Sequence, residues 1–135
     1  MDNAGTFTLA SEQITNARTA AALTAIEDLD GMTAVTLVAR FSYGSVASGG
    51  TCAAVVQTSL DGGTYWYDIA RFDFTTANAV KKCNLEGLLS VAVGSYSVLA
   101  SEGVNDGLLG DRLRVVITSV DTYANTTLDV RASVR

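Results

Sequence analysis

Histidine is absent from this chain of 135 residues, and its absence removes a large group of chemistries. Imidazole is the usual general base near neutral pH, the proton acceptor of serine and cysteine triads, and the most common metal ligand. Most hydrolase designs are therefore excluded. We expect a protein that is not an enzyme and that has no catalytic residues, no cofactor and no metal site.

Cysteine is scarce. Only Cys52 and Cys83 occur, and they lie far apart without Cys-x-x-Cys spacing, so neither a zinc site nor a disulfide framework is indicated. The first residues, Met1 to Gly5, are acidic and polar where a secretory signal needs positive charge and an apolar core. Without export, the sequence favours two free thiols on strands over one disulfide.

Long apolar runs and an excess of positive charge are also missing. No stretch approaches the roughly 20 apolar residues that are needed to cross a bilayer. Nine basic residues stand against 14 acidic ones, which gives a net charge of −5. The chain therefore lacks the basic surface that binds nucleic acid. Neither a membrane nor a nucleic acid is an expected partner.

Proline is absent, and lysine occurs only as the adjacent pair Lys81 and Lys82. Isolated β-proteins commonly protect their edge strands with proline, lysine or other charges. The sequence therefore predicts poorly protected sheet edges, which neighbouring subunits or chain ends would cover.

The residues that are present predict one all-β domain. A chain of this length with 48% hydrophobic residues can bury a core of its own. In several segments apolar residues alternate with polar ones, which is typical of half-buried strands. The clearest of these segments are 32–43, 51–59, 65–74, 112–120 and 127–134. Their spacing predicts a two-sheet antiparallel β-sandwich, with a jelly roll as one form of it.

Other parts of the chain have a weaker pattern. We expect a strand within residues 20–29, a short strand at 80–85, and a long loop over 86–110 with one brief strand near 96–101. Residues 1–22 are expected to be an N-terminal arm or edge strand, and residues 23–135 the sandwich domain.

Carboxylates are the remaining route to catalysis or metal binding. A glycosidase needs two carboxyl groups across a cleft, but Asp68 and Asp73 have opposite parity on one expected strand and should point to opposite faces. The acidic run at residues 27–30 lacks the spacing of an EF-hand loop, so a turn is favoured over a calcium site.

Residues 59–66, Ser-Leu-Asp-Gly-Gly-Thr-Tyr-Trp, resemble the Asp-box, Ser-x-Asp-x-Gly-x-x-Trp, a hairpin motif of sialidases and of many unrelated β-proteins. The resemblance implies that Asp61 holds the turn and that Trp66 packs beneath it, remote from catalysis. The neighbouring rings of Tyr65, Trp66 and Tyr67 also offer a platform for sugars. The favoured alternative places Trp66 in the core and half-buries the two tyrosines.

Six apolar residues stand where a free monomer would carry polar ones. Two of them lie in a polar N-terminal stretch with too few apolar positions to build a core layer, and four lie in the expected long loop. We expect the first group to become ordered against a neighbouring chain. The predicted partner interface is Phe7, Leu9, Leu88, Leu89, Val91 and Val93.

Residues 25–32, 55–70 and 110–115 resemble stretches of small structural proteins of tailed bacteriophages, and the resemblance covers residues 23–135. Within that group the chain is most similar to capsid decoration, or cement, proteins, which bind the outside of an icosahedral shell and bridge neighbouring subunits. The resemblance implies a virion protein assembled in the host cytoplasm. It implies contact with the major capsid protein or other virion subunits, and a homo-oligomer on the particle. A tail or head–tail joining protein and a carbohydrate-binding β-sandwich module are the alternatives.

Overall fold

The computed structural model describes residues 4–135, and β-strands are the only regular secondary structure in that range. No helix of those residues is long and apolar enough to span a membrane. The strands are β1 Gly5–Ile14, β2 Arg18–Ala22, β3 Ala34–Ser42, β4 Ser45–Val46, β5 Thr51–Ser59, β6 Tyr67–Phe74, β7 Ala79–Glu86, β8 Gly103–Val104, β9 Arg112–Val120, β10 Tyr123–Ala124 and β11 Thr126–Val134.

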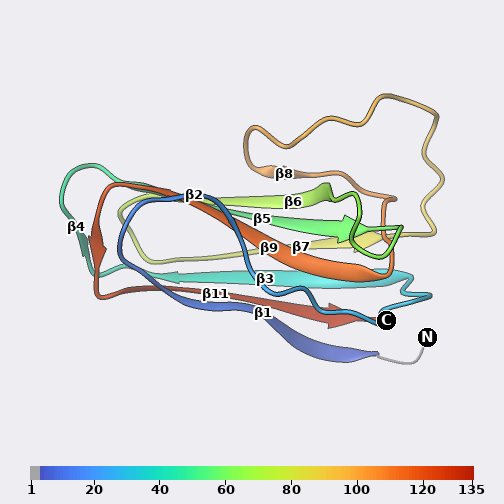
Figure 1. The fold of residues 1–135 in the computed structure, drawn as a ribbon, viewed down its shortest axis with the longest axis horizontal. Helices are drawn as coiled ribbons and strands as arrows, with labels where there is room; N and C mark the ends of the chain where they lie inside the picture. Colours follow the sequence, from blue (N-terminus) through green and yellow to red (C-terminus); the bar gives the residue numbers. More distant parts are fainter. Residues whose placement is uncertain (1–3) are drawn as a thin grey trace.

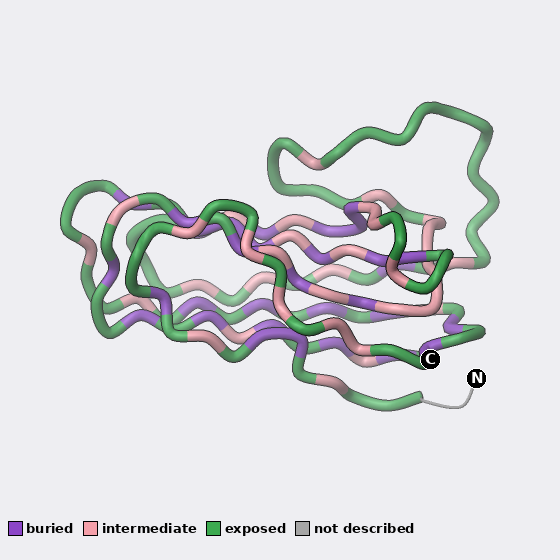
Figure 2. The backbone as a smooth tube through the Cα atoms, in the orientation of Figure 1, coloured by how far each residue is buried: buried purple, intermediate pink, exposed green. Residues whose placement is uncertain are grey.

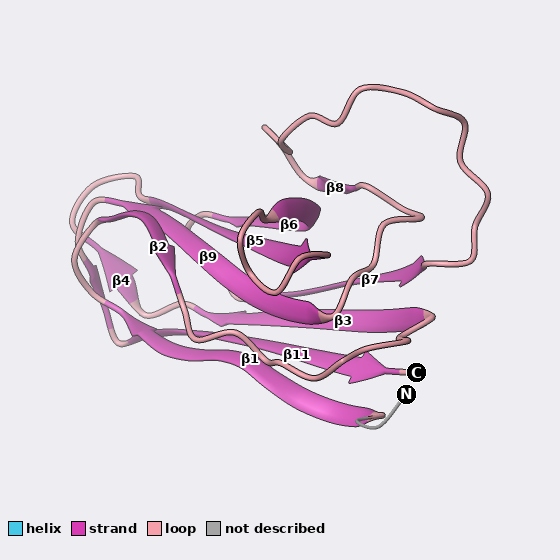
Figure 3. Ribbon diagram, turned by 45° about the vertical axis from the view of Figure 1, so that its right-hand side comes forward, coloured by secondary structure: helices cyan, strands magenta, loops and turns pink. Residues whose placement is uncertain are grey.

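Two antiparallel sheets face each other and form the predicted β-sandwich (Figure 1, Figure 3). Sheet A has the strand order β1-β11-β3-β7, and sheet B has the order β2-β9-β5-β6-β8. A short ribbon of β4 and β10 lies at one end of the sandwich. The all-β class, the two sheets and the antiparallel pairing are therefore confirmed.

The strand pairs are nested one inside the next. The hairpin of β5 and β6 is innermost, and it is enclosed in sequence by the pair β3 and β7, then by β2 and β9, and finally by β1 and β11. Apart from that hairpin, the long strands alternate between the two sheets along the chain. The first and last strands therefore become neighbours in sheet A.

The core lies between the sheets and contains the alternating apolar residues of each long strand (Figure 2). In β3 the odd residues Val35 to Phe41 are buried while their even neighbours face solvent. The ring of Phe41 stacks on Phe74 at 4.9 Å and meets the edge of Tyr123 at 5.8 Å between centroids. The buried Tyr123 hydroxyl donates to the Thr75 carbonyl at 2.8 Å, so this polar group is satisfied.

The N-terminal segment is part of the sandwich, because β1 pairs with β11 from Gly5 to Ile14 as the edge strand of sheet A. A bulge at Leu9 turns both Leu9 and Ala10 into the core, and Ile14 is buried as well. The expectation that this segment has too few apolar positions to join a core is wrong. Strict alternation would turn only one of the neighbours Leu9 and Ala10 inward, but the bulge turns both inward.

Two weaker predictions are corrected. The strand expected within residues 20–29 is β2 at Arg18–Ala22, and the chain from 23 to 33 is irregular apart from one bridge between Ile26 and Leu113. Positive φ angles at Ala20 and Asp28 interrupt an extended conformation there. The brief strand expected near residues 96–101 is β8 at Gly103–Val104.

Candidate functional site: an anchored apolar loop

Residues 87–102, which we call the apolar loop, leave the sandwich after β7 and return through β8 (Figure 1, Figure 2). Leu88 is 74% exposed, Val91 61%, and Val93 fully exposed, whereas core residues are nearly inaccessible. Four of the six predicted interface residues lie in this loop on the surface, and Tyr96 and Val98 extend the exposed set. Such a group of exposed aliphatic side chains is typical of a contact surface.

The loop is anchored to sheet B through Asp68 of β6. The Asp68 carboxylate accepts a hydrogen bond from the Leu99 main-chain N–H at 3.0 Å, and the Asp68 N–H donates to the Tyr96 hydroxyl at 2.7 Å. The Asn105 amide donates to the Asp68 carbonyl at 2.8 Å and to the Ser97 carbonyl at 3.2 Å. These bonds hold the middle and end of the loop against one strand.

Charged side chains fasten the end of the loop, at Leu99 and Glu102. The Arg71 guanidinium donates to the Leu99 carbonyl at 2.9 Å. Glu102 accepts from the Lys81 ammonium at 2.7 Å and from the Asp73 N–H at 3.0 Å. The bond from Lys81 holds the pKa of the Glu102 carboxyl below its ordinary value. Residues 96–102 are therefore held to sheet B, and the exposed aliphatic residues of 88–93 precede this anchored stretch.

The anchor continues across sheet B as a chain of polar contacts. The Gln57 amide donates to the Asp68 carboxylate at 2.8 Å and accepts from the Arg114 guanidinium at 2.8 Å. Arg114 lies 4.1 Å from the centroid of the Trp66 ring. Burial lowers the pKa of Arg114, yet its guanidinium remains a cation at neutral pH and stacks favourably on the indole.

The Asp-box turn has the geometry that its resemblance implies. The Asp61 carboxylate accepts from the Tyr65 N–H and from the Ser59 hydroxyl, both at 2.9 Å. The bond from Tyr65 lowers the pKa of the Asp61 carboxyl. Gly62 and Gly63 have positive φ angles that residues with a Cβ rarely adopt. The predicted hairpin is confirmed.

Trp66 is half-buried at this turn, so its placement in the core is wrong. Its indole N–H donates to the Gly63 carbonyl at 3.0 Å, and its ring is covered by Arg114. The Tyr67 ring meets the edge of Tyr96 at 5.1 Å. Two of the three rings of the expected sugar platform are therefore engaged within the chain, and Tyr65 is the exposed one.

The carboxylates Asp68 and Asp73 lie on the same face of sheet B, not on opposite faces. The register passes from the pair Val56 and Ala70 to the pair Gln57 and Asp68, so Ile69 is an extra residue that reverses the parity. Asp73 bonds to Arg71 at 2.8 Å and Asp68 bonds to Gln57 and Leu99. Both carboxylates are thus engaged in holding structure together.

The two N-terminal interface candidates lie away from the loop. Leu9 is 4% exposed in the core, so its side chain is not available to a partner. Phe7 is half-buried against the core. The structure thus brings Leu88, Leu89 and Val91 together in one loop and places Leu9 inside the chain's own sandwich.

The sheet edges carry protection that composition alone did not reveal. Both lysines lie on the edge strand β7, and Lys81 is half-buried with its ammonium 5.2 Å from the Phe74 ring. The opposite edge strand β1 carries its bulge and the half-buried Glu12, which pairs with Arg18. Bulges and inward charges are devices that discourage edge-to-edge pairing. The expectation of poorly protected edges is therefore wrong for β1, whereas on β7 the lysines disfavour pairing with a second copy but leave the main-chain edge open.

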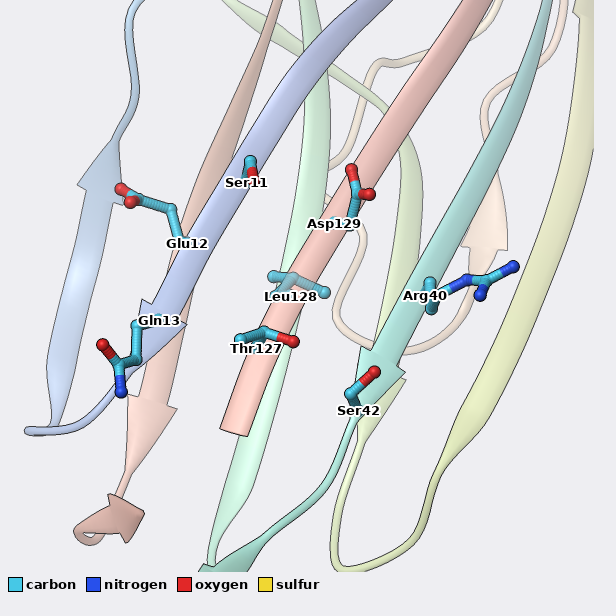
Figure 4. A pocket seen from close by; sticks show the side chains of 8 residues that line it. All are labelled: Ser11, Glu12, Gln13, Arg40, Ser42, Thr127, Leu128 and Asp129. Carbon is cyan, nitrogen blue, oxygen red and sulfur yellow. The ribbon is translucent and has the colours of Figure 1, made fainter. Parts of the chain in front are cut away.

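The outer face of sheet A has a shallow, open hollow of about 250 Å³ (Figure 4). Its lining residues come from β1, β3 and β11, and Arg40 extends away from Asp129 toward solvent. The residues that line it are Ser11, Glu12, Gln13, Arg40, Ser42, Thr127, Leu128 and Asp129. No ionisable side chain among them is buried, so this is a solvated polar face without a convergent site.

Both cysteines are free thiols, as predicted, and both lie on strands. Burial raises the pKa of Cys52 and of Cys83 to about 11. The thiolate is the reactive form, so both groups are inert near neutral pH. Within residues 4–135 no group of three or more Asp, Glu or Cys side chains is arranged to hold a metal ion.

Comparison with protein-family models, with curated proteins and with solved structures finds no match to this chain.

Proposed function

We propose that this chain is a non-enzymatic structural subunit of a tailed-bacteriophage virion, a decoration protein that binds the outside of the capsid and bridges neighbouring subunits. The observation that carries the proposal is the apolar loop, which exposes Leu88, Leu89, Val91 and Val93 and is anchored to sheet B at residues 96–102. The virion assignment rests on the likeness of residues 23–135 to phage structural proteins.

An anchored apolar loop favours docking for a simple energetic reason. Each aliphatic side chain that becomes fully buried at an interface contributes roughly 1.5–3 kcal/mol. A flexible loop would lose much of that gain in the entropy of its ordering. Here Asp68, Arg71 and Glu102 already fix the end of the loop before any partner is bound, which shortens the stretch that remains to be ordered.

The nested strand pairs give further support. We infer a jelly roll from the order in which β5–β6, β3–β7, β2–β9 and β1–β11 enclose one another. Jelly rolls are frequent among viral capsid and lectin domains, so this inference agrees with a virion role by analogy of fold. On a shell, many weakly bound copies add up to a large stabilisation through multivalency.

Copy number tests the assignment to the shell. Intact particles that contain the chain should hold a fixed, high number of copies per major capsid subunit, as measured by quantitative mass spectrometry. A few copies per particle would instead identify a tail or head–tail joining protein and overturn the decoration role. Binding to a glycan array in the absence of shells would favour the carbohydrate-binding alternative.

Variants of the apolar loop test the docking surface. Replacing Leu88 and Val93 by serine should abolish co-sedimentation with capsids that lack the chain, because two exposed aliphatic contacts are lost. The same change at Val120, a 56% exposed valine of β9, is the matched control and should leave co-sedimentation unchanged. The melting temperatures of all three proteins should agree. Equal sedimentation of the loop variant and the control would refute docking through this loop.

A further inference from the structure

Strand β7 offers the longest unbroken open edge of either sheet. Sheet A ends at β1 and β7, and sheet B ends at β2 and β8. The register of β1 is broken at Leu9, that of β2 is broken between Arg18 and Ala21, and β8 has only two residues. Strand β7 pairs with β3 without a shift from Ala79 to Glu86. An added strand needs such a continuous edge.

The main-chain groups of β7 alternate between β3 and the open side. Gly87 N–H donates to the Thr33 carbonyl at 2.7 Å, toward β3, whereas Glu86 N–H donates to the Asp106 carboxylate at 2.8 Å, on the open side. Because N–H groups alternate in direction along an antiparallel strand, those of Val80, Lys82 and Asn84 also point to the open side. A carboxylate thus already caps one end of this edge.

A mainly apolar slot of about 360 Å³ lies beside the edge, between β7 and β8. It is positioned to receive alternate side chains of a strand laid along β7, and the exposed Val104 forms part of its wall. The residues that line the slot are Arg71, Phe72, Lys81, Lys82, Cys83, Glu102, Gly103 and Val104.

The positive charge around the slot favours a partner strand that carries acidic residues. Three cations, Arg71, Lys81 and Lys82, gather at the slot of a chain whose net charge is −5. Arg71 pairs with Asp73 and Lys81 pairs with Glu102, while Lys82 has no ion-pair partner within residues 4–135. Lysines on an edge disfavour a second copy of the same strand and favour a strand that carries acidic residues.

We propose that the open edge of β7 is a strand-addition site for an extended segment of a partner protein in which acidic and apolar residues alternate. The segment would form main-chain hydrogen bonds with Val80, Lys82 and Asn84 and insert apolar side chains into the slot. This inference rests on the proposed docking function and specifies the chemistry of the partner.

Amide hydrogen exchange of the full chain, followed by NMR, tests the proposal. The probe is a ten-residue peptide that alternates glutamate and valine, and the comparison peptide has lysine in place of glutamate. The glutamate peptide should slow exchange at Val80, Lys82 and Asn84, whereas Lys81 and Cys83 are already bonded to β3 and should not change. It should bind at least about tenfold more tightly than the lysine peptide, and this ratio should shrink as salt rises.

Two substitutions sharpen the test. Asn84→Pro removes one outward N–H without touching the ladder to β3, a position where edge strands tolerate proline. It should weaken binding of the glutamate peptide at least about tenfold, whereas Asn84→Ala keeps the N–H and should bind as the parent does. Lys82→Glu should reverse the preference between the two peptides. Circular dichroism and melting verify that each variant is folded.

Three outcomes would overturn strand addition at β7: no binding of the glutamate peptide, binding without protection of the three amides, or self-association of the chain through this edge. The assay contains no capsid and leaves residues 88–93 unchanged. Its failure would therefore leave docking through the apolar loop standing, and the capsid experiments above decide that question separately.

Discussion

Replacing Asp68 by alanine should release the apolar loop and lower the stability of the whole sandwich. The substitution removes a carboxylate from a residue that is only 6% exposed and leaves the Gln57 amide and the Leu99 N–H without their acceptor. A hydrogen bond to a charged group contributes about 1.5–3 kcal/mol, and water that enters the vacated site recovers part of the two bonds. We therefore expect a loss of about 2–4 kcal/mol.

For a chain of this size, such a loss lowers the melting temperature by about 8–16 °C. Thermal unfolding measures the total effect, and amide exchange at Leu99 reports the loop itself. Asp129→Ala is the matched control, because this residue lies on the outer face of sheet A and its side chain is 31% exposed in a surface ion pair with Arg131. That control should lose no more than about 0.5 kcal/mol.

Two results would refute this account of the anchor. If the free energy of unfolding of Asp68→Ala lies within about 0.5 kcal/mol of that of the parent, the carboxylate does not hold the loop. If stability falls but exchange at Leu99 stays slow, the loss arises within sheet B and the loop is held by its other contacts.

Three further predictions concern the turn, the first strand and the thiols. Trp66→Ala should cost about 1–2 kcal/mol in urea unfolding, because the ring is half-buried, and a loss above about 3 kcal/mol would indicate a core position. Deletion of residues 1–12 should abolish cooperative melting in circular dichroism, since it removes most of β1 and the buried Leu9; a native-like melt would contradict this. The thiol pKa values of Cys52 and Cys83 rise from 9.0 to about 11 on folding, so their contribution to stability is complete below pH 9 and is lost as pH rises to 11. The melting temperature should fall over that interval, and less steeply for Cys52→Ala; equal slopes would argue against the thiols as the cause.

The two-sheet fold could be predicted because alternation is a property of each strand by itself. Val35, Leu37 and Phe41 reveal their common face without knowledge of any other strand. Bulges are harder to predict. A single extra residue moves every later side chain of the strand to the opposite face of the sheet, and the alternating pattern of the sequence does not reveal where that residue lies. This is why alternation alone predicts Leu9 at a surface and Asp68 and Asp73 on opposite faces, whereas the bulges place them otherwise.

The apolar loop could be predicted in part. Leu88 and Val93 stand among glycines and serines, which marks them as loop residues, and the structure exposes both. The anchors could not be predicted, because Asp68 and Leu99 are 31 residues apart and Lys81 and Glu102 are 21 apart. Hydrogen bonds over such distances depend on the pairing of strands, which no local pattern specifies.

The adjacency of the first and last strands bears on the order in which the chain can assemble. Gly5 faces Val134 across the β1–β11 pair, so β1 must wait for the final strand before its own pairing can form (Figure 1). A short linker between the two ends would turn this pair into a local hairpin. New ends opened in the exposed tip at residues 47–49 would leave both sheets intact. In such a circular permutant the β1–β11 pair would join residues that are close in sequence instead of residues at opposite ends of the chain. The permutant should therefore fold faster than the parent protein.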